Sequence, residues 1–441
     1  MRAKELYNSF FIRRGNGISG MRVLYALLIA LCTPLIMLYL GWRGLRDNRY
    51  WHGWGERFGY LKPGKYRHGV LLHAASLGEL NAAGPLLKAL QSSFPDLPVA
   101  VSTLTPTGAE GVLQNLGEHV FHTYLPLDLR GAVERFLDRL QPCLIIIVET
   151  EIWPNLYLQA HKRGTPLVMA NARLSAVSRR RFRYVSGFIR RVLQTVAWVG
   201  AQSTQDAQWL IACGTKPRHT QVTGNLKFDL SVLIKSAGQA DATRAIWGSK
   251  RPVLVAGSTH ERDEHIVIPA FIEILKKRPD ALLVLAPRRP ERFCPVAAAV
   301  RLTGLRMALH SEFDHSLLQT TQCLVVDAMG VLLMYYACAD LVFIGGSFGT
   351  QGGHNALEPA ALGKPVLMGP NMQNATEIAG QLVNCGAALQ VTDQQAFQSA
   401  ANRVLGDDSL REQMGLAGQR LVEENKGALN KTLQAIQQIL G

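Results

Sequence analysis

The chain has 441 residues, of which 48% are hydrophobic and 18% are charged, a composition that excludes an intrinsically disordered protein. This length is sufficient for two domains and too long for one ordinary hydrophobic core. The formal net charge of +14 favours an anionic partner, and the seven scattered cysteines, without a CxxC pair, argue against a zinc ribbon or a disulfide framework.

The first predicted element is a membrane-anchoring helix. Residues 23–40 read VLYALLIALCTPLIMLYL, without a charged side chain, and as a helix they would extend about 27 Å, close to the thickness of a bilayer's hydrocarbon core. We expect an N-terminal extension over residues 1–20 and an anchor helix over residues 21–46. A buried core helix is the alternative. Whether the helix spans or only inserts stays open, because arginines flank both ends.

From Gly69 onward, short apolar strands alternate with helices, which is typical of a parallel sheet covered on both faces. The predicted strands are VLLHAAS, PVAVSTLT, CLIIIVET and PLVMANA, followed by PVLVAGST, ALLVLAPR, CLVVDA, LVFIGGS and KPVLMGP. The pattern predicts an α/β fold of two doubly wound domains, residues 47–228 and 229–441. Their ligand sites are expected at the carboxyl ends of the strands, facing a cleft.

Carboxylates follow two strands of the first domain. Glu79 starts a helix, where the helix dipole favours an acidic residue; in a cleft it could instead act as a general base. Glu149 and Glu151 flank Thr150, and alternation would point both the same way. Such a pair requires a cation, a shared proton or an amine partner, unless it only marks a helix start. Glu79 and Glu149 are the candidate catalytic residues.

In the second domain, the stretch over residues 341–370 predicts a strand, a glycine loop, a capped helix and a second strand. Asn355 is expected at the helix N-cap, with Glu358 at capping-box spacing. A loop of this kind can offer unpaired helix N–H groups to an anion, although an ordinary strand–helix turn has the same pattern. Arg288 and Arg289 end another strand, where they could bind a phosphate or pair with Glu291.

Basic residues alternate with aromatic ones in the first domain, which is typical of a helix at a membrane surface or of an acidic-lipid site; a solvated basic face is the alternative. The cluster comprises Arg179, Arg180, Arg181, Arg183, Arg190 and Arg191. His260 and His265 are five residues apart, so they do not form the HExxH zinc motif, and we expect no metal. The sequence also lacks GxxxxGK[ST], and GxGxxG after the first strand.

Taken together, these segments resemble the 3-deoxy-D-manno-octulosonic acid (Kdo) transferases of lipopolysaccharide synthesis. The resemblance runs in order from about residue 21 to the C-terminus. The matching stretches are WGERFGY (54–60), HAASLGE (73–79), TPTG (105–108), ETEIWPN (149–155), ANARLS (170–175), TGNLKFD (223–229), STHERDE (258–264), PRRPERF (287–293) and GGHNALEPAALGKPVLMGPNMQN (352–374).

The resemblance implies a GT-B glycosyltransferase with an N-terminal membrane helix, at the cytoplasmic side of the inner membrane. Its substrates would be CMP-Kdo and the lipid A precursor, and it would invert the anomeric centre without a metal or other cofactor. Glu79 would be the base. The implied nucleotide contacts are Pro287, Arg288, Met329, Gly330, Val331, Asn355, Ala356, Leu357 and Glu358. The family often has Glu where Val331 stands, so this position can offer only backbone or packing.

Three other functions compete with this interpretation. One is a GT-B enzyme with a UDP-sugar donor, and another is a non-catalytic scaffold that binds anionic lipid. Nucleic-acid binding would rest on the net charge alone, since no aromatic-basic RNA motif is present, and we expect no nucleic-acid partner.

Overall fold

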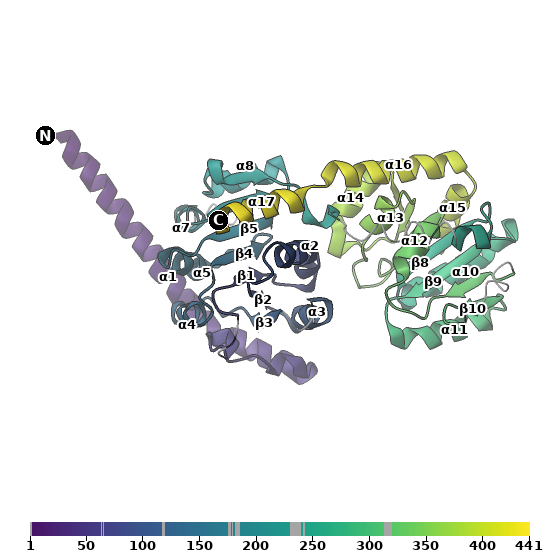
Figure 1. Ribbon diagram of the computed structural model, residues 1–441, viewed down its shortest axis with the longest axis horizontal. Helices are drawn as coiled ribbons and strands as arrows, with labels where there is room; N and C mark the ends of the chain where they lie inside the picture. Colours follow the sequence, from purple (N-terminus) through teal and green to yellow (C-terminus); the bar gives the residue numbers. More distant parts are fainter. Residues whose placement is uncertain are drawn as a thin grey trace. The chain divides into compact units, whose positions relative to one another are not determined.

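The computed structural model describes residues 2–62, 64, 66–116, 120–174, 178, 180, 186–229, 240, 243–312 and 320–441. The chain forms two compact units (Figure 1). Unit 1 comprises Met1–Asp229 and Lys426–Gly441, and unit 2 comprises Leu230–Asn425. Each unit is built around one parallel sheet, so the predicted fold class is confirmed.

Helix α1 runs over Arg2–Arg46 without a break, so the predicted extension and anchor are one helix (Figure 1). Among the described residues, its segment Gly20–Arg46 alone is long and apolar enough to cross a membrane. Met21 and Tyr25 pack against the core of unit 1. Leucines on the outward face are exposed, with fractions from 64% to 73% at Leu27, Leu31, Leu35 and Leu38. A buried core helix is therefore excluded for this segment.

The sheet of unit 1 has the order β3-β2-β1-β4-β5-β6-β7. Its strands are β1 Val70–His73, β2 Val99–Thr103, β3 Phe121–Tyr124, β4 Leu144–Val148, β5 Leu167–Ala172, β6 Trp198–Ala201 and β7 Thr220–Val222. The helices are α2 Leu77–Ser93, α3 Pro106–Leu116, α4 Arg130–Leu140, α5 Pro154–Lys162, α7 Ser186–Leu193 and α8 Thr204–Cys213, with 3-10 turns η1 Asn48–Trp51, η2 Glu56–Phe58, η4 Pro217–His219 and η5 Leu226–Phe228. The strand order reverses between β1 and β4, where open α/β sheets bind ligands.

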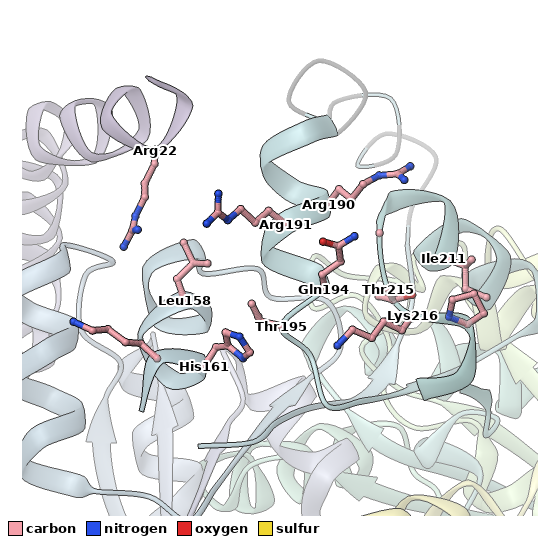
Figure 2. A pocket seen from close by; sticks show the side chains of 13 residues that line it. Arg22, Leu158, His161, Arg190, Arg191, Gln194, Thr195, Ile211, Thr215 and Lys216 are labelled. Atoms are coloured by element: carbon pink, nitrogen blue, oxygen red, sulfur yellow. The ribbon is translucent and has the colours of Figure 1, made fainter. Parts of the chain in front are cut away.

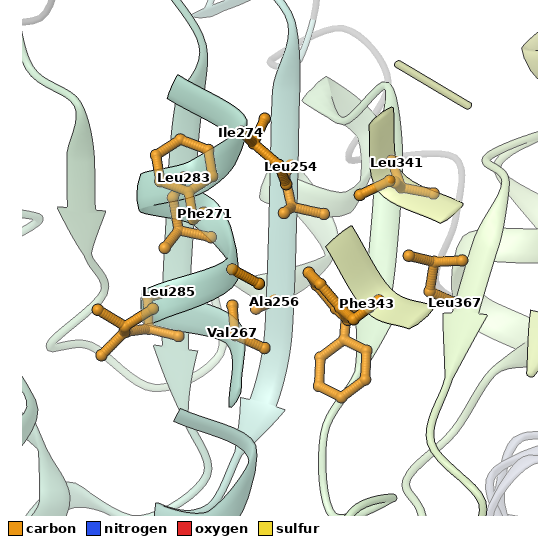
Figure 3. Packing of buried hydrophobic residues seen from close by; sticks show 14 of the residues in the cluster. Leu254, Ala256, Val267, Phe271, Ile274, Leu283, Leu285, Leu341, Phe343 and Leu367 are labelled. Carbon is orange, nitrogen blue, oxygen red and sulfur yellow. The ribbon is translucent and has the colours of Figure 1, made fainter. Parts of the chain in front are cut away.

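The sheet of unit 2 has the order β10-β11-β9-β8-β12-β13-β14, with its reversal between β8 and β12. Its strands are β8 Val253–Thr259, β9 Leu282–Pro287, β10 Met307–Leu309, β11 Cys323–Val325, β12 Leu341–Ile344, β13 Val366–Met368 and β14 Ala388–Gln390. The helices are α10 Glu261–Lys277, α11 Phe293–Leu302, α12 Leu332–Cys338, α13 Leu357–Ala361, α14 Thr376–Asn384, α15 Gln394–Leu405 and α16 Asp408–Asn425, with turns η6 Pro290–Arg292 and η7 Gln373–Ala375. Figure 3 shows Phe271 of α10 packed over Leu254 and Leu283 of the central strands.

The C-terminal helix α17, Ala428–Leu440, belongs to unit 1 and not to the second domain in which the sequence analysis placed it. Its residues Ala428 and Ile436 are buried in the core of unit 1. The Asp229 carboxylate accepts hydrogen bonds from the backbone N–H groups of Gly427 (2.8 Å) and Leu429 (2.7 Å). Two backbone N–H groups at the start of α17 are thus satisfied by a residue about 200 positions earlier.

Candidate active site

Glu79 lies in the first turn of α2, directly after the loop that follows β1 at the reversal point of the sheet. Ser76 is the N-cap, and its hydroxyl both accepts from the Glu79 N–H (3.4 Å) and donates to Glu79 Oε1 (3.2 Å). The Ala75 N–H donates to Glu79 Oε2 (2.8 Å). Both carboxylate oxygens are thus held in place by the cap of α2.

The Glu79 carboxylate is tuned toward neutral pH. Burial raises its pKa to about 7, and the negative charges of Glu149 and Glu151 add to the rise. The hydrogen bonds from Ala75 and Ser76 act against it. A base whose pKa lies near the working pH is well suited to general-base catalysis, which distinguishes Glu79 from an ordinary first-turn glutamate.

Glu149 follows β4, on the other side of the reversal point, with a φ of 62°. Its carboxylate is paired with two cations, Arg173 Nε at 3.4 Å and Lys227 Nζ at 3.7 Å. Burial raises the pKa of the Glu151 carboxyl, and the negative charge of Glu149 raises it further. Of the partners expected for this carboxylate pair, the structure provides a guanidinium and an amine.

Sequence reasoning missed the roles of Arg173 and Lys227, although both lie in stretches quoted for the family resemblance. Arg173 follows β5 and Lys227 lies in η5, after β7. Their position after two strands of the same parallel sheet was the available signal, because the carboxyl ends of parallel strands share one edge of the sheet.

The loop between β4 and α5 is fixed by a buried aspartate. Asp128 Oδ2 accepts hydrogen bonds from the Asn155 N–H (2.8 Å) and from the Tyr25 hydroxyl of α1 (2.7 Å), and Oδ1 accepts from the Leu156 N–H (3.0 Å). Asp128 therefore satisfies the first turn of α5 and connects it to α1. The segment that carries Glu149 is held in this way at its downstream end.

In unit 2, the glycine loop after β12 is folded around Asp263 of α10. The Asp263 carboxylate accepts hydrogen bonds from the N–H groups of Gly346 (2.7 Å), Phe348 (3.1 Å) and His260 (2.8 Å). Gly346 has a φ of 71°, in the left-handed region that favours glycine. The N–H groups of Gly346 and Phe348 are therefore already satisfied by Asp263, whereas the predicted anion site concerns the N–H groups of the helix that follows this loop.

The capping box predicted for Asn355 and Glu358 is also wrong. Helix α13 begins at Leu357, its N-cap is Ala356, and it has no side-chain cap of the expected kind. Asn355 Oδ1 accepts from the Leu357 N–H (3.0 Å), while Asn355 Nδ2 donates to Glu358 Oε1 (3.1 Å). Because Glu358 does not cap the helix, its carboxylate is available for a ligand, and burial raises its pKa.

Two histidines that the sequence analysis did not select meet at the reversal point of unit 2. The rings of His260 and His354 are stacked at 5.2 Å, and their Nε2 atoms lie 2.9 Å apart, a distance at which one N–H donates to the other nitrogen. Burial, the neighbouring His260 and Arg288 lower the pKa of His354 to about 4. The sequence signals for this pair were His354 in the GGHN stretch and His260 directly after a predicted strand.

The other predicted nucleotide contacts lie after strands of unit 2. Pro287 ends β9, and the Arg288 N–H donates to the Thr259 carbonyl (3.0 Å). The side chain of Arg288 is exposed and forms no ion pair with a described carboxylate, whereas Arg289 pairs with Glu291 at 3.8 Å. Met329 and Gly330 precede α12, Val331 is its N-cap, and Ala356 and Leu357 are buried.

Arg179, Arg181 and Arg183 of the predicted basic cluster lie outside the described residues, and Arg180 is exposed. Arg190 and Arg191 lie near the end of α7. Within the described part of the chain, no three His, Cys, Asp or Glu side chains are grouped as ligands of a metal ion would be.

Comparison with known proteins identifies the family. A family model described as 3-deoxy-D-manno-octulosonic-acid transferase (kdotransferase) matches residues 52–230. The 3-deoxy-D-manno-octulosonic acid transferase of Haemophilus influenzae is 36% identical, over 95% of this chain and 99% of that protein. The chain belongs to the Kdo transferase family of lipopolysaccharide biosynthesis. The enzyme of the same name from Bordetella pertussis is 33% identical, over 95% of this chain and all of that protein.

Solved structures confirm the GT-B fold. The UDP-GlcNAc 2-epimerase from Neisseria meningitidis covers 84% of this Kdo transferase and all of its own chain, with a TM-score of 0.54 and 15% identity. At this identity the similarity concerns the fold alone.

Proposed function

We propose that this Kdo transferase moves Kdo from CMP-Kdo to a hydroxyl of the lipid A precursor, with inversion and without a metal, and that Glu79 is the general base. The observation that carries the proposal is the Glu79 carboxylate at the reversal point of unit 1, with its pKa raised to about 7. The identity of the transferred sugar, Kdo, follows from the family, and the role of each residue is argued from the site.

In the proposed reaction, the acceptor hydroxyl oxygen attacks the anomeric carbon of Kdo. The bond from that carbon to the phosphate oxygen of the donor breaks, and CMP departs with the electron pair. Glu79 takes the proton of the attacking hydroxyl. One displacement from the opposite face inverts the configuration, through an oxocarbenium-like transition state.

The cap of α2 does not prevent Glu79 from acting as a base. A carboxylate has about four lone-pair positions, and the bonds from Ala75 and Ser76 occupy one on each oxygen. A position on each oxygen remains for the acceptor hydroxyl. The cap therefore orients the carboxylate, as is expected of a base that must meet its substrate in one geometry.

In unit 2, we assign the donor phosphate to Arg288, which is exposed and not neutralised by a described carboxylate. A guanidinium can form two parallel bonds to a phosphate and stabilise the charge of the departing CMP. Glu358, freed from the cap of α13, is assigned to the ribose hydroxyls. The stretches 287–288 and 329–331 are assigned to the rest of the nucleotide.

We also infer that α1 lies in one leaflet of the inner membrane, on the cytoplasmic side, and does not cross it. A crossing helix would carry its two ends to opposite faces. Here Tyr25 bonds to Asp128, and Arg49, just beyond the helix, pairs with Glu110 of α3 at 2.7 Å. Both ends of the apolar segment are thus attached to unit 1, while leucines cover its outward face.

The proposal is tested with Glu79→Gln in the full chain, incubated with CMP-Kdo and lipid A precursor. Mass spectrometry of the product is expected to show loss of transfer, while calorimetric titration shows unchanged CMP binding and a normal melting curve. Glu151→Gln is the matched carboxylate control and should keep transfer. Transfer by Glu79→Gln at the wild-type rate would exclude Glu79 as the base. Preference for UDP over CMP would favour a UDP-sugar donor, and absence of transfer by the wild type would favour the lipid-binding scaffold.

A further inference from the structure

A pocket of about 850 Å³ lies in unit 1, away from the carboxylates of the candidate active site (Figure 2). Its lining comprises Arg22, Leu158, His161, Lys162, Arg190, Arg191, Gln194, Thr195, Ile211, Gly214, Thr215, Lys216 and Pro217. A volume of this size is in the range of pockets that hold small organic ligands.

The pocket lies at the opposite edge of the sheet from Glu79. Besides Arg22, its lining comes from the ends of α5, α7 and α8 and from the segments that lead into β6 and β7. It therefore lies at the amino ends of these strands. Glu79 and Glu149 follow the carboxyl ends of β1 and β4. Because all these strands are parallel, the sheet separates the two locations, by about 20 Å for a six-residue strand.

The lining is cationic and, among the described residues, contains no carboxylate. Figure 2 shows Arg191 extending toward the side of the pocket where Arg22 lies, and Lys216 extending into the space below Arg191. None of these three forms an ion pair with a described carboxylate. Three like charges that converge on one space repel each other, so an anion between them would lower their energy.

Helix C-termini favour basic residues by themselves, and this ordinary explanation fits part of the lining. Arg190 makes a long contact of 3.5 Å with the Ala212 carbonyl and points away from Arg191 in Figure 2. The preference of helix C-termini for basic residues does not explain Arg22. Arg22 lies inside the continuous helix α1, whereas the helix ends that line the pocket belong to other helices.

The position of Arg22 indicates where the anion comes from. Arg22 immediately precedes the apolar segment of α1, and Val23, Leu24 and Leu27 beyond it are exposed. Tyr25, one turn later, is fixed to unit 1 by its bond to Asp128 and by a ring contact of 5.7 Å with Phe188 of α7. The pocket is therefore held beside the start of the apolar segment of α1. With α1 inserted in one leaflet, as inferred above, this position corresponds to the level of the lipid phosphates.

We propose that this pocket binds the phosphate headgroup of an anionic membrane phospholipid and thereby orients unit 1 on the bilayer. Arg22, Arg191 and Lys216 neutralise the phosphate, and Gln194 can hydrogen-bond to the glycerol or its ester oxygens. Leu158, Ile211 and Pro217 offer apolar contact to the start of the acyl chains. The proposal rests on the membrane insertion of α1 inferred above, but not on the transfer reaction.

The test compares the full-length protein with a pocket variant, Arg191→Gln/Lys216→Gln, and with a charge-matched control, Lys88→Gln/Arg139→Gln, two exposed cations of unit 1 outside the pocket. Binding is measured to vesicles of phosphatidylcholine alone and to vesicles that also contain phosphatidylglycerol. The wild type should bind the anionic vesicles more tightly. Two cations at a lipid phosphate are together worth about 25-fold in affinity, so the pocket variant should lose most of this gain. The control should keep it, and all three proteins should bind neutral vesicles alike through α1.

Equal losses in the pocket variant and the control would show diffuse charge attraction and overturn the proposal, as would retention of the full gain by the pocket variant. A titration with glycerol 1-phosphate without vesicles separates the two sources of phosphate: binding as tight as to anionic vesicles would indicate a soluble ligand and overturn the lipid assignment. Glu79→Gln should keep the anionic-lipid gain, so failure of the catalytic proposal and failure of the lipid site give different results.

Discussion

The raised pKa of Glu79 has a direct kinetic consequence. A general base acts only when ionised, so kcat/KM should fall as the pH drops below the pKa of Glu79, which burial raises to about 7. With that pKa, about half of the enzyme is active at pH 7 and about one tenth at pH 6. An ordinary glutamate, with a pKa near 4.3, would leave the rate nearly constant over this range.

Two substitutions should move the acidic limb of the pH–rate profile, the range over which kcat/KM falls with decreasing pH, in opposite directions. Ser76→Ala removes a hydrogen bond that lowers the pKa of Glu79, so the limb should move to higher pH. Glu151→Gln removes a negative neighbour that raises the pKa, so the limb should move to lower pH. Each shift should stay within about one pH unit, because burial is the largest cause and neither variant changes it much.

The assay is the initial rate of Kdo transfer at subsaturating acceptor, measured across the neutral range at constant ionic strength. Thermal melting at each pH is the control for unfolding, since Ser76→Ala also removes the cap of α2, at a cost of about 1 kcal/mol. A limb near the ordinary glutamate value, or one that both variants move in the same direction, would refute the assignment of Glu79 as the titrating base.

Three further predictions concern other parts of the molecule. Arg288→Gln should weaken CMP binding about tenfold or more in calorimetry, because a charged hydrogen bond is worth about 1.5–3 kcal/mol; an equal loss in Arg289→Gln would contradict a specific role. Tyr25→Phe should lower the free energy of unfolding by about 1.5–3 kcal/mol in chemical denaturation, because Asp128 loses a bond in a buried site; an unchanged value would mean that α1 is not docked through this bond. Asp263→Ala should raise the proteolysis rate of the glycine loop, since three N–H groups lose their acceptor; unchanged cleavage would show that the loop holds itself.

The elements that local patterns encode were predictable. The uncharged apolar segment predicted the apolar part of α1. The apolar strands predicted both parallel sheets, because burial of such strands on both faces leaves few other folds. Glu79 was selected as the candidate base from its place after a strand and from the resemblance of its loop to a family motif. What the pattern could not supply was its pKa, which depends on burial and on carboxylates from another strand.

The sequence by itself thus determined the apolar N-terminal helix, the fold class and the family of this protein. Only the tertiary structure decided which residues cooperate: Asp229 with the start of α17, Asp263 with the glycine loop, and His260 with His354. It also brought Arg173 and Lys227 to Glu149, and Arg22 to the pocket at the far edge of the sheet. The physical reason is the sequence separation of the residues that interact. Strand and helix patterns arise from neighbouring residues, whereas hydrogen bonds, ion pairs and burial join side chains that only the folded chain brings together.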